Sequence, residues 1–242
     1  MLNLEQINEY LEKIDGNHSE FYRRYNIQEI ENNYPEEDMA FWSEFMFFED
    51  KYLICLKHML ENSIKGDIID IGCQNGFQSE FFKNDRYSYI GVDCFDMKDL
   101  FYNVKEKNIS YQIGCFCKDL HLKDVKPKNS NNKIILSIMS LGYFNKALSD
   151  DKENYEKIGN KMIVEELKDE KFLYISTTQD LLNELVCYFD HYEILSQKNI
   201  MGENFSVVFF KKNIETGYPL CRPRNLFINP KKKLNYKELF NS

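Results

Sequence analysis

A short glycine-containing segment and an aspartate downstream of it have the residue types needed to hold a nucleoside. Asp70-Ile71-Gly72-Cys73-Gln74-Asn75-Gly76 follows an apolar run, and its two glycines allow the backbone to turn tightly and approach a ligand without a Cβ in the way. Asp93 lies 17 residues after Gly76, at the end of a second apolar run, where a carboxylate can accept both hydroxyls of a ribose. The glycine turn and the downstream acid together indicate a nucleoside-binding site.

The elements around these residues predict an α/β fold. Apolar runs predict seven strands, over residues 67–71, 87–92, 109–113, 133–139, 171–177, 192–196 and 205–210. Helical patterns lie between most of them, over residues 77–83, 97–107, 151–168 and 179–189. Strands that alternate with helices predict a mainly parallel sheet covered on both faces. No helix separates the last two strands, so one of them must run antiparallel to its neighbour.

The acid-x-Gly-x-x-x-Gly form of residues 70–76 resembles motif I of the class I S-adenosylmethionine-dependent methyltransferases. A dinucleotide-binding turn would instead read Gly-x-Gly-x-x-Gly. The resemblance covers roughly residues 64–211, including the order of the seven strands and the closing antiparallel hairpin. It implies a Rossmann-like, seven-stranded, mainly parallel sheet, S-adenosyl-L-methionine as the cofactor, and methyl transfer as the reaction.

The resemblance also implies which residues contact the cofactor at the carboxyl ends of the strands. These are Asp70, Gly72, Cys73, Gly76, Asp93, Cys94, Phe95, Gly114, Cys115, Phe116, Ser140 and Leu141. Asp70 would lie near the methionine ammonium group, and Asp93 would hold the ribose. Residues 94–95 and the turn at 114–116 would lie beside the adenine, whereas residues 140–141 would face the cofactor and the methyl-transfer site.

Two positions depart from the family pattern. Gln74 replaces the usual middle glycine of the turn, and Cys115 replaces the acid that is frequent after the third strand. Because of these departures, the chain could instead be a partner protein of the same fold that has lost catalysis. A separate alternative is that the glycines serve only the turn, with Asp93 as a helix cap.

Several residues are weak candidates for catalysis and acceptor binding. A base could come from His18, His121 or the hydroxyl of Tyr143, whereas His58 and His191 fit structural roles better. Tyr22, Tyr25 and Trp42, together with Tyr143, could border the acceptor pocket. After the fourth strand the chain lacks the aspartate and the Asp-Asn pair that hold the divalent ion of metal-dependent O-methyltransferases. We therefore expect a reaction without a metal.

Three regions are expected along the chain. Residues 1–62 form a helical cap or lid, residues 63–212 form the S-adenosylmethionine-binding domain, and residues 213–242 form a basic tail. The aromatic stretch 19–50 either packs on the sheet as a cap or closes over the acceptor. Arg23, Arg24, Arg222 and Arg224 could bind an anionic acceptor, since arginine forks onto phosphate.

Composition narrows the classes of function. Of the 242 residues, 43% are hydrophobic and 29% charged, and no apolar run reaches the roughly 18–20 residues of a membrane span. The odd number of cysteines, 7, indicates reduced thiols and a cytoplasmic protein. The net charge of −8, with 13 acidic and 3 basic residues in 1–50, makes nucleic acid an unlikely partner.

The favoured reading is methyl transfer to a small-molecule acceptor, in particular a hydroxyl of a sugar or nucleotide sugar in glycan biosynthesis. An RNA or protein methyltransferase that docks through the basic tail is the alternative.

Overall fold

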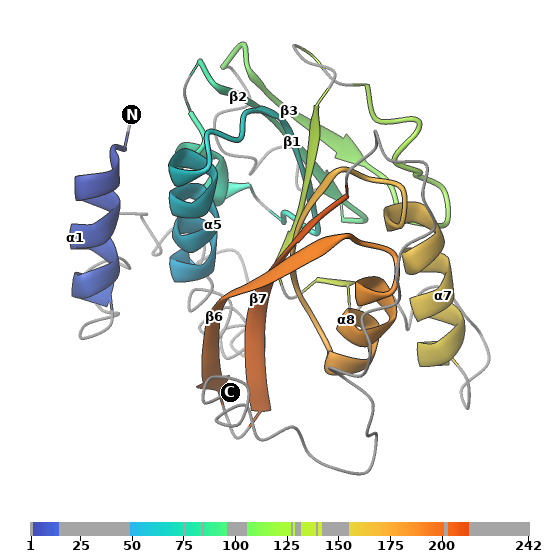
Figure 1. Cartoon of the computed structure of the whole chain (residues 1–242). Coiled ribbons are helices and arrows are strands. Elements are labelled where there is room, and N and C mark those ends of the chain that lie inside the picture. The colour runs from blue at the N-terminus through green and yellow to red at the C-terminus, as the bar shows by residue number, and fades with distance from the viewer. Residues whose placement is uncertain are drawn as a thin grey trace, which may run out of the picture.

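Seven strands form one sheet in the computed structural model, which describes residues 2–14, 49–74, 76–83, 85–95, 106–126, 128, 132–138, 140–141, 155–200 and 203–212 (Figure 1). The strands are β1 (Gly66–Ile71), β2 (Tyr87–Asp93), β3 (Ile109–Ile113), β4 (Lys133–Ile138), β5 (Phe172–Ser176), β6 (His191–Ile200) and β7 (Glu203–Lys211). Their order across the sheet is β3-β2-β1-β4-β5-β7-β6. The first five are parallel, and β7 runs antiparallel to both of its neighbours.

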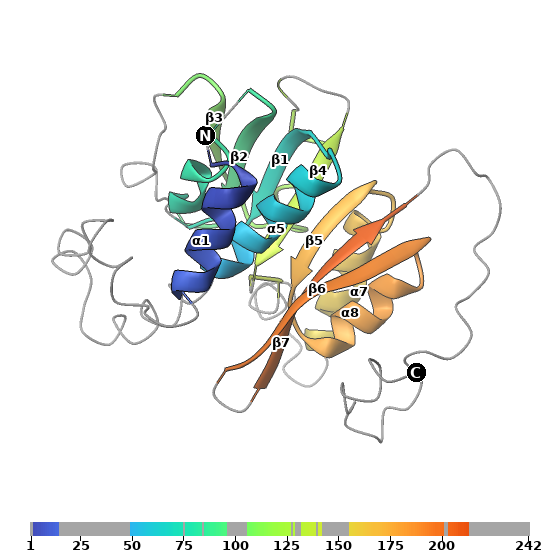
Figure 2. The same ribbon diagram turned by 60° about the vertical axis from the view of Figure 1, so that its left-hand side comes forward.

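Helices cover both faces of this sheet (Figures 1 and 2). On one face lie α1 (Leu4–Ile14), which packs on α5 (Glu49–Glu61), and the short 3₁₀ helix η2 (Phe77–Glu80). On the other lie α7 (Tyr155–Leu167) and α8 (Gln179–Val186). Within the described residues, no helix is long and apolar enough to cross a membrane.

Alternation along β1 divides the apolar core into two clusters. Side chains point to opposite faces at successive strand positions. Ile68 therefore packs in the cluster under α5, whereas Ile69 and Ile71 pack in the cluster under α7 and α8. Asp70 shares the face of Ile68, so its carboxylate points into the layer between the sheet and α5.

The fold expected from the sequence is confirmed: a seven-stranded, mainly parallel, Rossmann-like sheet with an antiparallel C-terminal hairpin and N-terminal helices on one face. Two details differ. The helical stretch expected over 77–83 is a single 3₁₀ turn, and the closing strands are longer than 192–196 and 205–210. The helix expected over 97–107 lies mostly outside the described residues.

The closing hairpin extends past its neighbour. The β5–β7 ladder ends at the pair Ile175–Val208, but the β6–β7 ladder continues to Ile200–Glu203, with an irregularity between Ile194 and Ser196. Because β7 is antiparallel to β5, this extension lies beyond the carboxyl end of β5 (Figure 2). The hairpin therefore projects on the same side of the sheet as the glycine turn.

Candidate functional site

The turn after β1 lies at the topological switch point of the sheet, where β2 and β3 are on one side of β1 and β4 and β5 are on the other. Ligands of open α/β sheets bind at the carboxyl ends of the strands at such a point. Gly72 and Gly76 have φ angles of 76° and 68°, in the region that favours glycine. The Gly72 and Cys73 N–H groups both donate to the Val92 carbonyl, at 2.7 and 3.2 Å, which joins the turn to β2.

Gln74 adopts a glycine-like backbone conformation despite its side chain. Its φ angle is 49°, which costs a non-glycine residue about 1 kcal/mol. The Gln74 N–H donates to Asp93 Oδ2 at 2.8 Å. The replacement of the family's middle glycine therefore leaves the shape of the turn intact, and a charge-assisted hydrogen bond holds it.

Asp93 joins two loops at the carboxyl edge. Its side chain is 4% exposed, and while Oδ2 accepts from Gln74, Oδ1 accepts from the Phe95 N–H at 3.1 Å. Both donors are backbone amides of the turns that follow β1 and β2. The Cys94 thiol also makes a hydrogen bond to Asp93, and since a carboxylate offers about four acceptor positions, these three donors do not fill them.

Asp70 is fully buried directly beneath the turn. Its Oδ2 accepts from the Tyr89 hydroxyl at 2.5 Å and from Gln78 Nε2 at 2.6 Å. Gln78 Nε2 also lies 3.0 Å from the Cys73 carbonyl and 3.4 Å from the Tyr52 hydroxyl. Among the described residues, the remaining oxygens Asp70 Oδ1 and Gln78 Oε1 are buried and have no hydrogen-bond donor. Two acceptors thus lie unsatisfied below the glycine turn.

The protonation state of Asp70 is balanced near neutral pH. Burial raises the pKa of its carboxyl group to about 7, and the charge of Asp93 adds to the increase. The hydrogen bonds from Tyr89 and Gln78 act in the opposite direction, because they stabilise the carboxylate. Both forms of Asp70 are therefore populated near pH 7.

The residues expected beside the adenine divide into exposed and buried ones. Phe95 is 68% exposed, Cys94 is also exposed, and Ile113, which pairs with Asp93 across β2 and β3, is 51% exposed. Although the residue is exposed, partial desolvation of its thiol and the charge of Asp93 raise the pKa of Cys94 to about 11, so the thiol stays protonated at neutral pH. Exposed apolar side chains next to Asp93 suit the face of a planar base.

The turn after β3 contributes backbone more than side chains. The Gly114 N–H donates to the Asp93 carbonyl at 2.9 Å, and a Cβ on Gly114 would lie 2.7 Å from Leu120 Cβ. Phe116 is completely buried in the core, so its ring does not reach this edge. The Cys115 N–H donates to Asp119 Oδ1, which brings a carboxylate to this loop although residue 115 is not an acid.

The segment after β4 is fastened to β1. Ser137 and Ser140 hydroxyls both lie within hydrogen-bond distance of the Ile71 carbonyl, at 3.2 and 2.5 Å. Leu141 is fully buried in the cluster under α7 and α8. In this arrangement residues 140–141 bring the ends of β4 and β1 together and do not present free side chains to a ligand.

The structure places one catalytic candidate and not the others. His121 Nδ1 lies 2.5 Å from Glu166 Oε1 near the end of α7, and Glu166 Oε2 accepts from the Leu122 N–H. The nearby Leu122 carbonyl accepts from Lys133, the first residue of β4, so His121 lies toward the amino edge, away from the glycine turn. The remaining candidates for catalysis and acceptor binding lie outside the described residues: His18, Tyr22, Tyr25, Trp42 and Tyr143.

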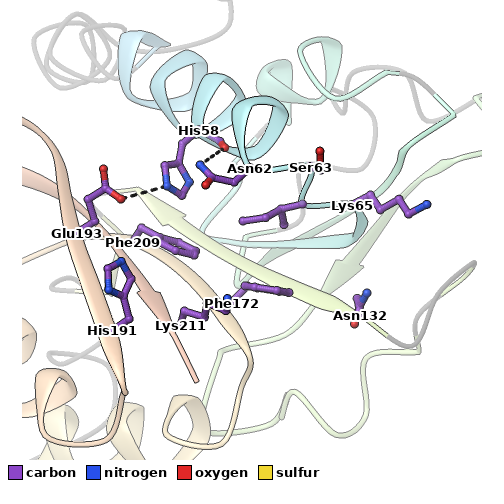
Figure 3. Close-up of a pocket in the computed structure, with 11 residues that line it drawn as sticks. His58, Asn62, Ser63, Lys65, Asn132, Phe172, His191, Glu193, Phe209 and Lys211 are labelled. Atoms are coloured by element: carbon purple, nitrogen blue, oxygen red, sulfur yellow. Dashed lines mark hydrogen bonds and ion pairs between the residues drawn. The ribbon is translucent and has the colours of Figure 1, made fainter. Parts of the chain in front are cut away.

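A pocket of about 340 Å³ lies at the amino edge of the sheet (Figure 3). His58 from α5 forms one wall, with Nδ1 2.9 Å from the Tyr174 hydroxyl and Nε2 3.4 Å from Glu193 Oε2. In the tautomer in which Nε2 donates to Glu193 Oε2, Nδ1 accepts from the Tyr174 hydroxyl. Burial lowers the pKa of His58, which keeps the ring neutral in this arrangement. His58 thus has the structural role expected from the sequence, fastening α5 to the sheet.

The sequence did not reveal Gln78, Tyr89 and Tyr52 as partners of Asp70. Tyr89 is visible only once the register pairs Ile68 with Tyr89 on β1 and β2. Tyr52 comes from α5, and no motif links that helix to the turn. An amide two residues after Gly76 was the one local signal available.

Comparison with known proteins gives structural similarity without sequence similarity. No family model and no curated protein matches the chain. Of the solved structures, EvdMO1 is 12% identical with a TM-score of 0.48, over 69% of this chain and 42% of EvdMO1. The N-methyltransferase NodS from Bradyrhizobium japonicum, in complex with S-adenosyl-L-homocysteine, is 12% identical with a TM-score of 0.46, over 68% and 87%. A TehB-like SAM-dependent methyltransferase from Corynebacterium glutamicum is 14% identical with a TM-score of 0.44, over 74% and 100%.

The chain spans less than half the length of EvdMO1. Such low identities and TM-scores carry neither a ligand nor a reaction over to this chain. Its own strand order and antiparallel β7 are those implied by the resemblance to class I S-adenosylmethionine-dependent methyltransferases.

Proposed function

We propose that the protein is a cytosolic, metal-independent methyltransferase that transfers a methyl group from S-adenosylmethionine to a small-molecule acceptor. The observation that carries the proposal is the joining of the glycine turn to Asp93 at the switch in strand order. The six described cysteines, all free thiols, fit a reducing compartment.

The residues at this edge fit the three parts of the cofactor. Asp93 retains acceptor capacity for a ribose hydroxyl, and the exposed Phe95 and Ile113 offer apolar surface for the adenine. The unsatisfied oxygens of Asp70 and Gln78 suit the methionine ammonium group, which has three N–H donors. When bound, S-adenosylmethionine supplies a methyl group activated by a sulfonium. The contribution of the protein is to hold the two reactants in line.

A hydroxyl of a sugar or nucleotide sugar, as used in glycan biosynthesis, is the acceptor that we favour. The acidic residues 1–50 disfavour a nucleic acid, and an anionic acceptor would find arginines in the same segment. We assign residues 1–62 to the cap, 63–212 to the methyltransferase domain and 213–242 to the tail. Tyr22, Tyr25, Trp42 and Tyr143 remain the proposed acceptor contacts, with His18 or Tyr143 as the base.

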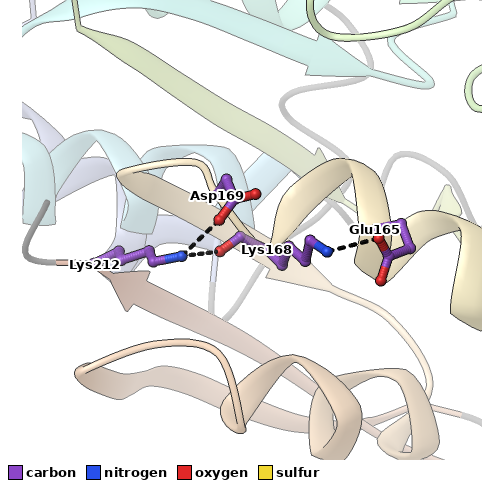
Figure 4. A network of polar contacts seen from close by, with 4 residues as sticks. All are labelled: Glu165, Lys168, Asp169 and Lys212. Atoms are coloured by element: carbon purple, nitrogen blue, oxygen red, sulfur yellow. Dashed lines mark hydrogen bonds and ion pairs between the residues drawn. The ribbon is translucent and has the colours of Figure 1, made fainter. Parts of the chain in front are cut away.

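The first test is calorimetric titration of the full chain with S-adenosylmethionine and S-adenosylhomocysteine. We expect micromolar binding, and a loss of about tenfold or more in Asp93→Ala, because charge-assisted hydrogen bonds to the ribose disappear. Asp169→Ala is the matched control. Asp169 is an aspartate on the amino side of β5 that accepts from Lys212 Nζ at 2.8 Å, so its loss leaves the glycine turn unchanged (Figure 4).

The outcomes separate the candidate functions. Absence of binding in the wild-type protein would refute the methyltransferase proposal. Binding without turnover on any labelled acceptor supports the partner protein that has lost catalysis. A steep loss of acceptor binding with added salt supports an RNA or protein acceptor that docks through the tail.

A further inference from the structure

Asp70 and Gln78 are joined by one hydrogen bond, and each has one further oxygen that lacks a hydrogen-bond donor in the described part of the chain. Gln78 Nε2 donates to Asp70 Oδ2 at 2.6 Å, so the amide and the carboxyl group are direct neighbours in a dry layer. Gln78 Oε1 and Asp70 Oδ1 are the atoms that have no donor among the described residues. A buried acceptor without a donor is costly. A proton on Asp70 Oδ1 turns that oxygen into a hydroxyl donor, which is the kind of group that Gln78 Oε1 lacks within the described residues.

We propose that Asp70 and Gln78 form a neutral acid–amide pair in the empty protein, and that entry of the cofactor's ammonium group displaces this proton to solvent. The O–H bond of the carboxylic acid breaks, the proton passes to the buffer, and the ammonium N–H groups take its place as donors. The proposal rests on the proposed function, and it couples cofactor affinity to pH through these two residues.

The other groups that face Asp70 favour this exchange. From α5 come Tyr52 and Cys55, from the turn Cys73, and from β2 Tyr89 and Asp93. Burial raises the pKa of both tyrosines and both thiols, so at neutral pH these four are uncharged. Two further charged residues of α5 are buried in this layer, Asp50 and Lys51, and they act on the Cys55 thiol in opposite directions. The charge of Asp93 raises the pKa of Asp70 further.

The test is to count the protons released when S-adenosylhomocysteine binds to the full chain. Calorimetry in two buffers of different ionisation enthalpy gives this number. We expect close to one proton per cofactor at about pH 6, falling toward none at about pH 8.5, and affinity that rises up to about tenfold per pH unit below pH 7. The comparison ligand 5′-methylthioadenosine has the base and ribose but no ammonium group, so it should bind without releasing a proton.

Variants assign the proton to its residue. Asp70→Asn has no acid to ionise, so proton release on binding should fall to near zero and the affinity should lose its pH dependence. Asp67→Asn is the matched control, since Asp67 lies on the opposite face of β1, where it accepts from the Ser88 hydroxyl. This control should release the same number of protons as the wild-type protein.

The experiment can refute the proton exchange at Asp70 and still leave the proposed cofactor site supported. S-adenosylhomocysteine binding with equal proton counts at both pH values, or proton release that persists in Asp70→Asn, would show the inference to be wrong while the cofactor site stands. Failure of both ligands to bind the wild-type protein would instead remove the proposed function. If Asp70→Asn does not fold, the comparison of the two ligands on wild-type protein still decides the question.

Discussion

The two edges of the sheet satisfy their buried polar groups in opposite ways. At the amino edge, His58 has a partner on each ring nitrogen, Tyr174 and Glu193, and a pocket of about 340 Å³ lies beside it. At the carboxyl edge, Asp70 and Gln78 are buried more deeply, and each has an oxygen with no donor in the described part of the chain.

The difference favours the carboxyl edge over the hollow at the amino edge as the candidate ligand site. Native proteins leave few buried polar atoms unpaired, so each exception calls for an explanation, and a bound ligand is one. The hollow at the amino edge has a satisfied histidine and a structural explanation. The unsatisfied oxygens at the carboxyl edge belong to Asp70 and Gln78 and lie beneath the glycine turn. They are acceptors for which the described residues supply no hydrogen-bond donor, so a ligand with N–H groups could bind there.

The largest change in stability is expected from adding a side chain at Gly66, at the amino edge of the sheet. Gly66 has a φ angle of 156°, and a Cβ there would lie 2.3 Å from the Asn132 carbonyl oxygen, which belongs to the backbone before β4. Gly66→Ala should lower the free energy of unfolding by about 4 kcal/mol, because neither strand can yield. Urea unfolding measures this change. Lys65→Ala, at the neighbouring exposed residue, should change it by less than about 0.5 kcal/mol. An equal loss in both variants would contradict the argument.

The second prediction concerns stability against pH at the carboxyl edge. The pKa of Asp70 is about 7 in the fold, against 3.8 for the free side chain, so the folded state holds its proton over a range where the unfolded chain has released it. Stability from this group is full below about pH 4 and is lost as the pH rises through about 7. Between about pH 5 and about pH 7, the empty wild-type protein should lose up to about 2.5 kcal/mol relative to Asp70→Asn.

Unfolding of both proteins across this range checks the prediction. His58, whose pKa is lowered by burial, changes stability in the opposite direction, but it does so equally in both proteins and cancels in the difference. Above about pH 7, Asp70→Asn should equal or exceed the wild type in stability, since an asparagine amide supplies a donor for Gln78 Oε1. Parallel curves for the two proteins would mean that Asp70 is ionised throughout.

The fold and part of the candidate site could be predicted from the sequence. Periodicity predicted the sheet and the direction of the hairpin, and residue spacing joined Asp70, the glycines and Asp93 at one edge. The partners of Asp70 depend on strand register and on how α5 packs, and a local pattern contains neither. Phe116 looked like an adenine contact because it follows β3, yet its apolar ring gains more from the core than from a polar edge.

The third prediction concerns a smaller effect, in which a substitution at the amino edge lowers stability and one at the carboxyl edge weakens cofactor binding. Tyr174→Phe removes the hydroxyl that donates to His58 Nδ1 and leaves a buried ring nitrogen unpaired. The free energy of unfolding should fall by about 1–2 kcal/mol, and the affinity for S-adenosylhomocysteine should stay unchanged. The corresponding removal at the carboxyl edge, Tyr89→Phe, takes a donor from Asp70 and should weaken cofactor binding at neutral pH. If Tyr174→Phe also weakened binding, the two edges would not be independent.

The smallest effect tests whether the turn acts through its backbone or its side chain. Gln74→Gly relieves a left-handed φ angle worth about 1 kcal/mol, but glycine also makes the unfolded chain more disordered by about the same amount. Stability should therefore stay within about 0.5 kcal/mol of the wild type. The N–H that donates to Asp93 remains, so cofactor affinity should change less than about twofold. A β-branched valine adopts a left-handed φ angle poorly, so Gln74→Val should distort the turn. The backbone N–H of residue 74 would then move away from Asp93, and both stability and cofactor affinity should fall.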